Sequence, residues 1–133
     1  MICIRAGVFV VGVLTGSQVV AQSQCEDLSN ADRGHCLAEY GDFLEQQMVT
    51  AYTAAKSALE FKKDEFGGFN RRALEFLQPS QVSFEDFRKY FCEFDATISM
   101  KGSGLSIAYE KCRNEATEQR IKYLRSIPHM AGA

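Results

Sequence analysis

The chain has 133 residues, with 15 basic and 17 acidic side chains and a formal net charge of −2 at neutral pH. A chain of this length folds as one domain, which excludes a multidomain enzyme. Its weak acidity argues against nucleic acid as a partner, because a nucleic-acid-binding surface is expected to be basic. Its longest apolar run is too short for a membrane transporter.

The first 21 residues have the pattern of a secretory signal peptide. Arg5 is their single charge, an apolar run covers residues 6–14, and Val19 and Ala21 suit the −3 and −1 positions of a cleavage site. A permanent N-terminal anchor is the alternative, but a membrane-spanning helix needs about 20 apolar residues. We therefore expect a cleaved signal, and an exported single domain over residues 22–133 that lies in the periplasm or outside the cell without stable membrane insertion.

The next pattern is that of one long amphipathic helix. Ser29 or Asn30 would cap its N-terminus, and Gly67-Gly68 would end it. Apolar and small side chains recur every three or four residues along it, with most charged side chains on the other faces. The positions expected to face the core are Leu37, Tyr40, Leu44, Met48, Ala51, Ala55, Ala58, Leu59 and Phe66.

Two separate helices are expected in the middle of the chain. Asn70 would cap a short helix through Leu77, which Pro79 would end because proline lacks the backbone N–H that a helix requires. Ser83 would cap the second helix, and the acidic residues that follow it suit the first helical turn. Its apolar series is expected to be core: Phe84, Phe87, Phe91, Phe94 and Ile98.

The glycine-containing segment 100–106 is the clear interior loop, and the last helix follows it from Ile107 to Ile127. Pro128 would end this helix, and residues 129–133 are expected to form a frayed tail. Its expected inward positions are Ala108, Cys112, Ala116, Tyr123 and Leu124. With no alternating strand pattern, the predicted fold is all-α: a small disulfide-stapled bundle in which one long helix packs on a C-terminal αα-hairpin, with a short helix between them.

Four cysteines remain once Cys3 leaves with the signal: Cys25, Cys36, Cys92 and Cys112. In an oxidising compartment four cysteines most simply form two disulfides. Cys92 and Cys112 lie at similar distances from the loop, so an antiparallel hairpin brings them to the same level. Cys25 and Cys36 would then pair, with Cys25 on a segment folded back, because one helix would hold them about 16 Å apart. Crossed pairings stay open, since four cysteines allow three connectivities.

The sequence lacks recognisable catalytic and metal-binding motifs. It contains no Cys-x-x-Cys, G-x-S-x-G, Walker loop, EF-hand or H-E-x-x-H, and its cysteines lack the spacing of metal ligands. His35 and His129 are expected at the surface, and acidic pairs such as Glu85/Asp86 are expected to be solvent-facing charges rather than glycosidase carboxylates. We expect no catalytic residue, metal or cofactor, and therefore a binding protein rather than an enzyme.

Two strings of residues carry a family resemblance. The second half contains Gln81, Phe84, Arg88 and Cys92, then Gly102-Ser103-Gly104, then Cys112, Thr117, Arg120 and Leu124. The first half contains Cys25 and Cys36, followed by Glu45, Met48 and Tyr52. Together they resemble the LprI-type lysozyme-inhibitor domain, a family of small exported helical proteins of bacteria. The chain departs from the family pattern at Phe84, Val49 and Lys89, where Trp, Asn and an acid are usual.

The resemblance implies a protein that binds a host lysozyme and blocks its substrate cleft. Such an enzyme is cationic overall and has an acidic catalytic pair in that cleft. The candidate contact is the hairpin loop, whose lysine and serines could meet those carboxylates: Lys101, Gly102, Ser103, Gly104 and Ser106. A plain glycine turn is the alternative for this loop. Motif residues are expected to stabilise the bundle: Gln81, Phe84, Arg88, Thr117, Arg120 and Leu124. The four polar ones among them would hydrogen-bond loop carbonyls, and direct contact with a partner is the alternative for these four.

The alternative function is a periplasmic interaction or envelope-stress module with another partner and no activity towards lysozyme. The exposed face of the long first helix, or residues 67–72, would then form the contact.

Overall fold

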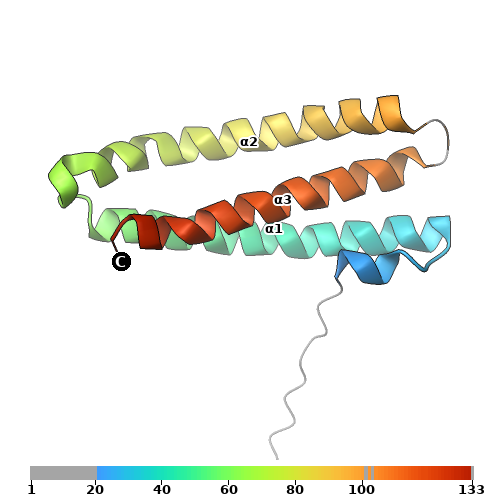
Figure 1. The fold of residues 1–133 in the computed structure, drawn as a ribbon, viewed down its shortest axis with the longest axis horizontal. Coiled ribbons are helices and arrows are strands. Elements are labelled where there is room, and N and C mark those ends of the chain that lie inside the picture. Colours follow the sequence, from blue (N-terminus) through green and yellow to red (C-terminus); the bar gives the residue numbers. More distant parts are fainter. Residues whose placement is uncertain (1–20, 101, 103, 133) are drawn as a thin grey trace, which may run out of the picture.

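The computed structural model describes residues 21–100, 102 and 104–132. These residues form η1 (Gln22–Cys25), α1 (Asn30–Phe61), η2 (Phe66–Gly68), α2 (Phe69–Ser99) and α3 (Leu105–Met130) (Figure 1). No strand occurs in this part of the chain, so the all-α prediction is confirmed. The expected signal peptide lies outside the described residues except for Ala21, and so do two residues of the candidate loop, Lys101 and Ser103.

The long first helix begins where the sequence predicts. Ser29 is the N-cap of α1, and its hydroxyl accepts a hydrogen bond from the backbone N–H of Asp32 at 3.3 Å. The helix ends at Phe61, before the two glycines, which adopt left-handed backbone angles that suit glycine and turn the chain towards α2. Most of the expected inward positions of α1 are buried, whereas Phe66 is 61% exposed and wrong as a core residue.

The core lies mainly between α1 and α3. These two helices run parallel, and α2 runs antiparallel to both (Figure 1). The main cluster joins apolar side chains of all three helices: Leu44, Met48, Ala51, Ala55, Leu59, Leu77, Ile121, Leu124, Ile127 and Ala131. A second, smaller cluster at the other end contains Cys25, Leu37 and Ile107. Burial of these side chains away from water is the main stabilising contribution of the bundle.

α2 is one helix, so the expected short helix, its end at Pro79 and the new start at Ser83 are all wrong. Proline removes one backbone N–H and crowds the carbonyl four residues earlier, which belongs to Glu75. Pro79 is exposed, so water can hydrate the carbonyl that has lost its donor. The helix therefore continues through the proline on its solvent side.

The C-terminal end differs from expectation in the same way. α3 passes through Pro128 and ends at Met130, so the predicted stop and the frayed tail are wrong as far as residue 132. Ala131 is buried, and its carbonyl accepts a hydrogen bond from Asn70 Nδ2 at 3.4 Å. Lys62 donates to the carbonyl of the following glycine. These contacts hold the last residues against the turn between α1 and α2.

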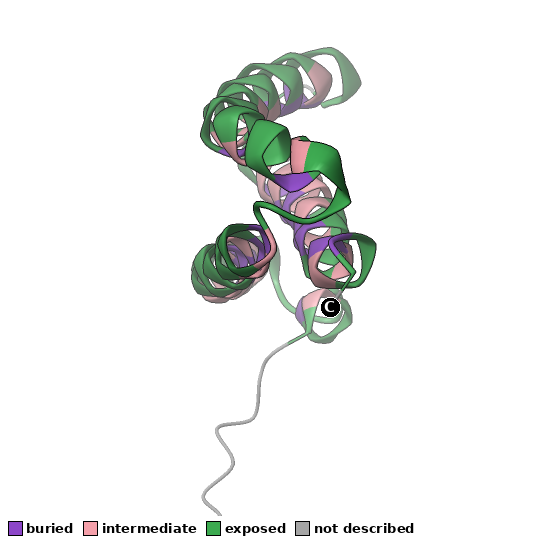
Figure 2. Ribbon diagram, turned by 90° about the vertical axis from the view of Figure 1, so that its left-hand side faces the viewer, coloured by how far each residue is buried: buried purple, intermediate pink, exposed green. Residues whose placement is uncertain are grey.

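The apolar series of α2 is mostly exposed, which corrects the prediction that it is core. Phe87, Phe94 and Ile98 are 60–61% exposed, and Phe91 is 45% exposed, while Phe84 is partly buried. The buried positions of α2 lie on a neighbouring face: Asn70, Leu77, Cys92 and Ala96. Tyr123 of α3, an expected inward position, is also exposed. Figure 2 shows how much of the surface of α2 is exposed.

Candidate functional site

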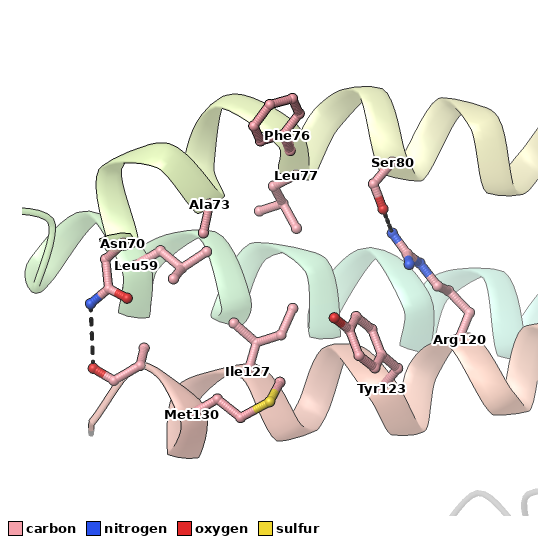
Figure 3. A pocket seen from close by; sticks show the side chains of 11 residues that line it. Leu59, Asn70, Ala73, Phe76, Leu77, Ser80, Arg120, Tyr123, Ile127 and Met130 are labelled. Atoms are coloured by element: carbon pink, nitrogen blue, oxygen red, sulfur yellow. Dashed lines mark hydrogen bonds between the residues drawn. The ribbon is translucent and has the colours of Figure 1, made fainter. Parts of the chain in front are cut away.

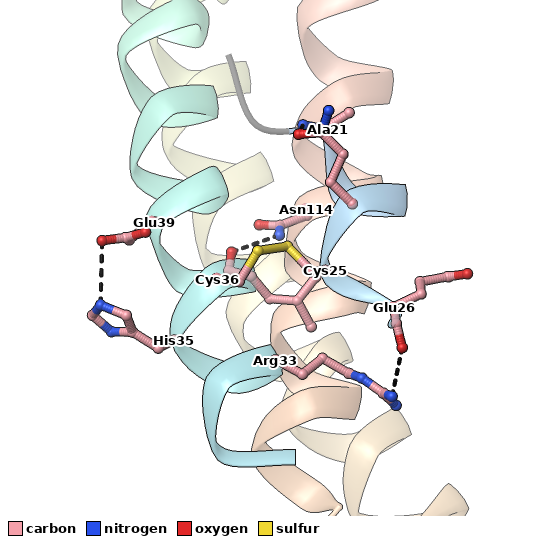
Figure 4. The surroundings of a disulfide bond; sticks show 10 residues. Ala21, Cys25, Glu26, Arg33, His35, Cys36, Glu39 and Asn114 are labelled. Carbon is pink, nitrogen blue, oxygen red and sulfur yellow. Dashed lines mark hydrogen bonds and ion pairs between the residues drawn. A yellow bond between two sulfur atoms is a disulfide. The ribbon is translucent and has the colours of Figure 1, made fainter. Parts of the chain in front are cut away.

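Two disulfides connect the elements at one end of the bundle. Cys25 is bonded to Cys36, with Cα atoms 5.7 Å apart, and Cys92 is bonded to Cys112, with Cα atoms 5.5 Å apart. This is the pairing favoured from the sequence. The first bond holds η1, which folds back onto α1 (Figure 4), and the second joins α2 to α3.

Hydrogen bonds reinforce the folded-back segment. The guanidinium of Arg33 in α1 donates to the carbonyl of Glu26 at 2.6 Å and to that of Leu28 at 3.1 Å. Asn114 of α3 donates from Nδ2 to the carbonyl of Leu37, next to Cys36 (Figure 4). The segment before α1 is thus attached to α1 by a covalent bond and by the two hydrogen bonds that Arg33 Nη2 donates.

Arg88 links all three helices. Its Nη1 donates to Glu45 Oε1 of α1 at 2.6 Å and to Thr117 Oγ1 of α3 at 2.6 Å. Only 12% of the Arg88 side chain is exposed, so these charge-assisted bonds are formed in a partly dehydrated place. The Thr117 hydroxyl in turn donates to the carbonyl of Arg113.

Arg120 occupies the next level of the same α2–α3 seam. Its Nε donates to Gln81 Oε1 at 3.0 Å, and its Nη2 donates to Ser80 Oγ at 2.8 Å (Figure 3). Its guanidinium and that of Arg88 each lie 5.4 Å from the centre of the Phe84 ring, where cation–π attraction applies. Burial lowers the pKa of Arg120, and the nearby Tyr123 and Glu85 act in the opposite direction.

We call these residues the three-helix polar cluster: Glu45, Gln81, Phe84, Arg88, Thr117 and Arg120. The structure brings together every motif residue predicted to stabilise the bundle except Leu124, which is fully buried in the core. Between helices, their hydrogen bonds run to side chains and not to the loop carbonyls expected from the sequence. The arrangement holds helices in place and presents no free nucleophile.

The hairpin tip is the turn between α2 and α3. Gly102 has φ +91°, a left-handed conformation that favours glycine. Ser106 and the flanking Met100 and Leu105 are exposed. The Cys92–Cys112 disulfide lies roughly 12 Å below the tip along the helices, at 1.5 Å per residue. Gly102 and Gly104 thus lie in a short turn above a covalent cross-link, whereas Ser106 of the candidate loop lies in the first turn of α3.

Contacts that the sequence analysis missed lie on the α1–α3 seam. The Tyr40 hydroxyl donates to Glu118 Oε1 at 2.6 Å, and burial together with this carboxylate raises the pKa of Tyr40 to about 12. Asn114 is fully buried. It lies seven residues from Ile107 and from Ile121 in the sequence. This heptad spacing between two isoleucines is the pattern that indicates a buried position for Asn114.

The described residues offer no obvious metal site or membrane span. No group of three or more His, Cys, Asp or Glu side chains in this part of the chain could hold a metal ion. His35 is exposed, as predicted, and its Nε2 lies 3.2 Å from Oε1 of the exposed Glu39. None of the helices in the described ranges combines the length and apolar character that crossing a membrane requires.

Comparison with known proteins gives one match. The family described as "Lysozyme inhibitor LprI" matches residues 22–124, which contain both disulfides and the whole three-helix polar cluster. No curated protein and no solved structure matches the chain.

Proposed function

Because the chain belongs to the LprI lysozyme inhibitor family, we propose that its exported domain binds a lysozyme and blocks the substrate cleft of that enzyme. The observation that carries this proposal is the family match over most of the chain. The two disulfides support export through a cleaved signal over residues 1–21 to the periplasm or the cell exterior, because disulfides persist in oxidising compartments. The domain would act by binding and not by catalysis.

The hairpin tip is the contact that we favour. It lies at one end of the molecule, and a cross-linked turn loses little conformational freedom when it binds. Lys101 would supply a positive charge to the acidic catalytic pair of the enzyme, and the serines would supply hydroxyl donors. The three-helix polar cluster would support this contact only indirectly, because its hydrogen-bonding groups bind one another.

The test adds the oxidised domain to c-, g- and i-type lysozymes and measures how far it inhibits their hydrolysis of peptidoglycan. Calorimetric titration of the same pairs measures binding. We expect stoichiometric inhibition of at least one type. Lys101→Glu should weaken binding by about tenfold or more, because it places a negative charge next to carboxylates. The matched control is Lys56→Glu, a charge reversal at an exposed lysine of α1 near the other end of the bundle.

Two results would contradict the proposal at different levels. If stoichiometric protein leaves all three lysozyme types fully active, the chain does not inhibit lysozyme, and an envelope module with another partner becomes the better hypothesis. Residues 67–72 would then be the first surface to test, since the neighbouring Phe66 is exposed, as is Phe69 within the segment. If inhibition occurs but Lys101→Glu and Lys56→Glu behave alike, the tip is not the contact.

A further inference from the structure

An uncovered apolar stripe runs along the C-terminal half of α2. Phe87, Phe91, Phe94 and Ile98 form it, and we call these four residues the α2 stripe. They follow one another at steps of four, three and four, so they lie on one face of the helix. The rings of Phe87 and Phe91 stack with their centres 5.3 Å apart. So large a group of exposed apolar side chains in line is unusual on a monomer and marks an interaction surface.

The same face of α2 borders a groove against α3. Near the N-terminal end of α2, Phe76 and Leu77 of α2 and Tyr123, Ile127 and Met130 of α3 are among the residues that line a cavity of about 300 Å³ (Figure 3). Further along, Phe91 lines a second hollow together with Cys112 and Ala116 of α3, and the polar side chains of Glu115, Glu118 and Gln119 form the rest of its wall. Apolar surface beyond the four stripe residues therefore lies mainly at the first cavity, whereas the wall of the second hollow is half polar.

The spacing of the stripe fits a helix as its occupant, because alternating steps of three and four are the pattern by which two helices interlock. We propose that this occupant is α2 of a second copy of the chain, packed antiparallel around a two-fold axis. With the axis between residues 92 and 93, Phe91 of one copy would meet Phe94 of its partner, and Phe87 would meet Ile98. The stripe would thus be complementary to itself, as a two-fold interface requires.

The area and the lack of charge support this occupant. A large aromatic side chain buries roughly 150–250 Å² when it is fully covered. With the observed exposures, complete covering of the stripe and the neighbouring Tyr90 would bury about 600 Å² per chain, so the contact has to include part of the groove as well. A stable interface needs about 800 Å² per partner. None of the four stripe residues is ionisable, so packing them against one another would bury no charge of their own.

The experiment is sedimentation velocity, with light scattering during size-exclusion chromatography, on the oxidised domain over residues 22–133 from micromolar to sub-millimolar concentration. We expect the mass of two chains. Phe94→Glu should raise the dissociation constant of the dimer at least ~100-fold, because each copy would bury a carboxylate against an aromatic ring. The control is Phe61→Glu, which alters an equally large and even more exposed phenylalanine on α1, outside the stripe.

Three outcomes would overturn the homodimer. One is a wild-type domain that remains monomeric throughout the concentration range, including a monomer that binds lipid vesicles through the stripe. Another is a dimer that Phe94→Glu leaves as tight as Phe61→Glu does. The third comes from p-benzoylphenylalanine placed at Phe91: cross-linked peptides should join α2 to α2, and links to any other segment alone would exclude this geometry. Helical circular dichroism and the melting temperature of each variant show whether it remains folded.

Discussion

Asn114 of α3 donates a hydrogen bond to the carbonyl of Leu37 in α1 across 2.9 Å, and both residues are fully buried. The two helices run parallel there, and the asparagine stands on α3 between two buried isoleucines, Ile107 and Ile121, each one heptad away. A polar side chain at such a position fixes the register of two helices, because any axial shift would leave it buried without a partner. The Cys25–Cys36 disulfide is adjacent to this contact (Figure 4).

Replacement of Asn114 by alanine should destabilise the domain by about 2 kcal/mol, because it removes a buried hydrogen bond and leaves a small cavity. Urea unfolding of the oxidised protein measures the free energy of unfolding. Gln119→Ala removes an exposed amide from the same helix and should change that free energy by less than about 0.5 kcal/mol. Equal effects of the two substitutions would show that Asn114 is not a structural contact.

Two glycines of α1 should respond to alanine with opposite signs. Alanine is a better helix former than glycine by about 1 kcal/mol, so Gly34→Ala should stabilise, since a Cβ at Gly34 meets nothing within 4 Å. A Cβ at Gly41 would overlap the Arg113 guanidinium and lie 2.7 Å from Asn114 Oδ1. We therefore expect Gly41→Ala to destabilise by about 1–3 kcal/mol, measured by the same urea titration. Stabilisation by both substitutions would mean that α3 does not approach Gly41 so closely.

The Tyr40–Glu118 hydrogen bond predicts a specific dependence on alkaline pH. The pKa of Tyr40 is raised by burial and by the carboxylate to about 12, from an ordinary value of about 10. The folded state thus holds the phenolic proton more tightly than the unfolded state, so this stabilisation is complete below pH about 10 and is lost as the pH rises towards about 12. Tyr40→Phe should lower the free energy of unfolding by about 1 kcal/mol at neutral pH. The variant should also lack the part of the alkaline loss of stability that comes from deprotonation of Tyr40.

The pH experiment compares the free energies of unfolding of the wild type and Tyr40→Phe at matched pH, so that other titrating groups cancel. Their difference should shrink between pH about 10 and 12. A constant difference across that window would mean that the Tyr40 hydroxyl does not titrate with a raised pKa. Phe43, whose ring centre lies 6.2 Å from that of Tyr40, keeps its stacking partner in the variant.

The sequence predicts α1 well and α2 poorly for a physical reason. α1 has one apolar face, and the chain itself covers that face, so periodicity alone identifies Leu44, Met48 and Ala55 as core. α2 carries two apolar sectors, one around Leu77 and Cys92 and the other along the α2 stripe. Periodicity shows that a face is apolar, but it does not show whether the same chain or another molecule covers it.

In the candidate site, the sequence predicts which residues share a helix face but not which residues they contact. Motif spacing identifies Gln81, Arg88, Thr117 and Arg120 as residues at one seam, because residues three and four apart share a helix face. Their actual partners depend on which helices meet and at what level. Glu45 lies 43 residues from Arg88 in the chain, and only the antiparallel pairing of α1 with α2 brings the two together. The contact across three helices could therefore not be predicted from local pattern.

A double-mutant cycle measures what the Arg88–Glu45 pair contributes. Arg88→Ala should destabilise by about 2–4 kcal/mol, since it leaves Glu45 without its cation and removes one of the two hydrogen bonds of Thr117 and one of the two cations at the Phe84 ring. Glu45→Gln should cost less, because Glu45 is the more exposed partner. A coupling energy of about 1 kcal/mol or more is expected from the four unfolding measurements. As a reference, the exposed pair Lys56–Glu60 on α1 should show about 0.5 kcal/mol or less.

Because α2 continues through Pro79, replacement of this proline by alanine should stabilise the domain. Pro79→Ala restores the backbone N–H that can donate to the Glu75 carbonyl, and alanine suits a helix interior better than proline by about 3 kcal/mol. Pro79 is exposed, so little packing is lost, and urea unfolding should show stabilisation of about 1–3 kcal/mol. Pro128 lies in the last turn of α3, where fewer helical bonds follow, so Pro128→Ala should stabilise less. If the chain instead broke into two helices at Pro79, with Ser83 as a true N-cap, Pro79→Ala would bring no gain and Ser83→Ala would cost about 1 kcal/mol.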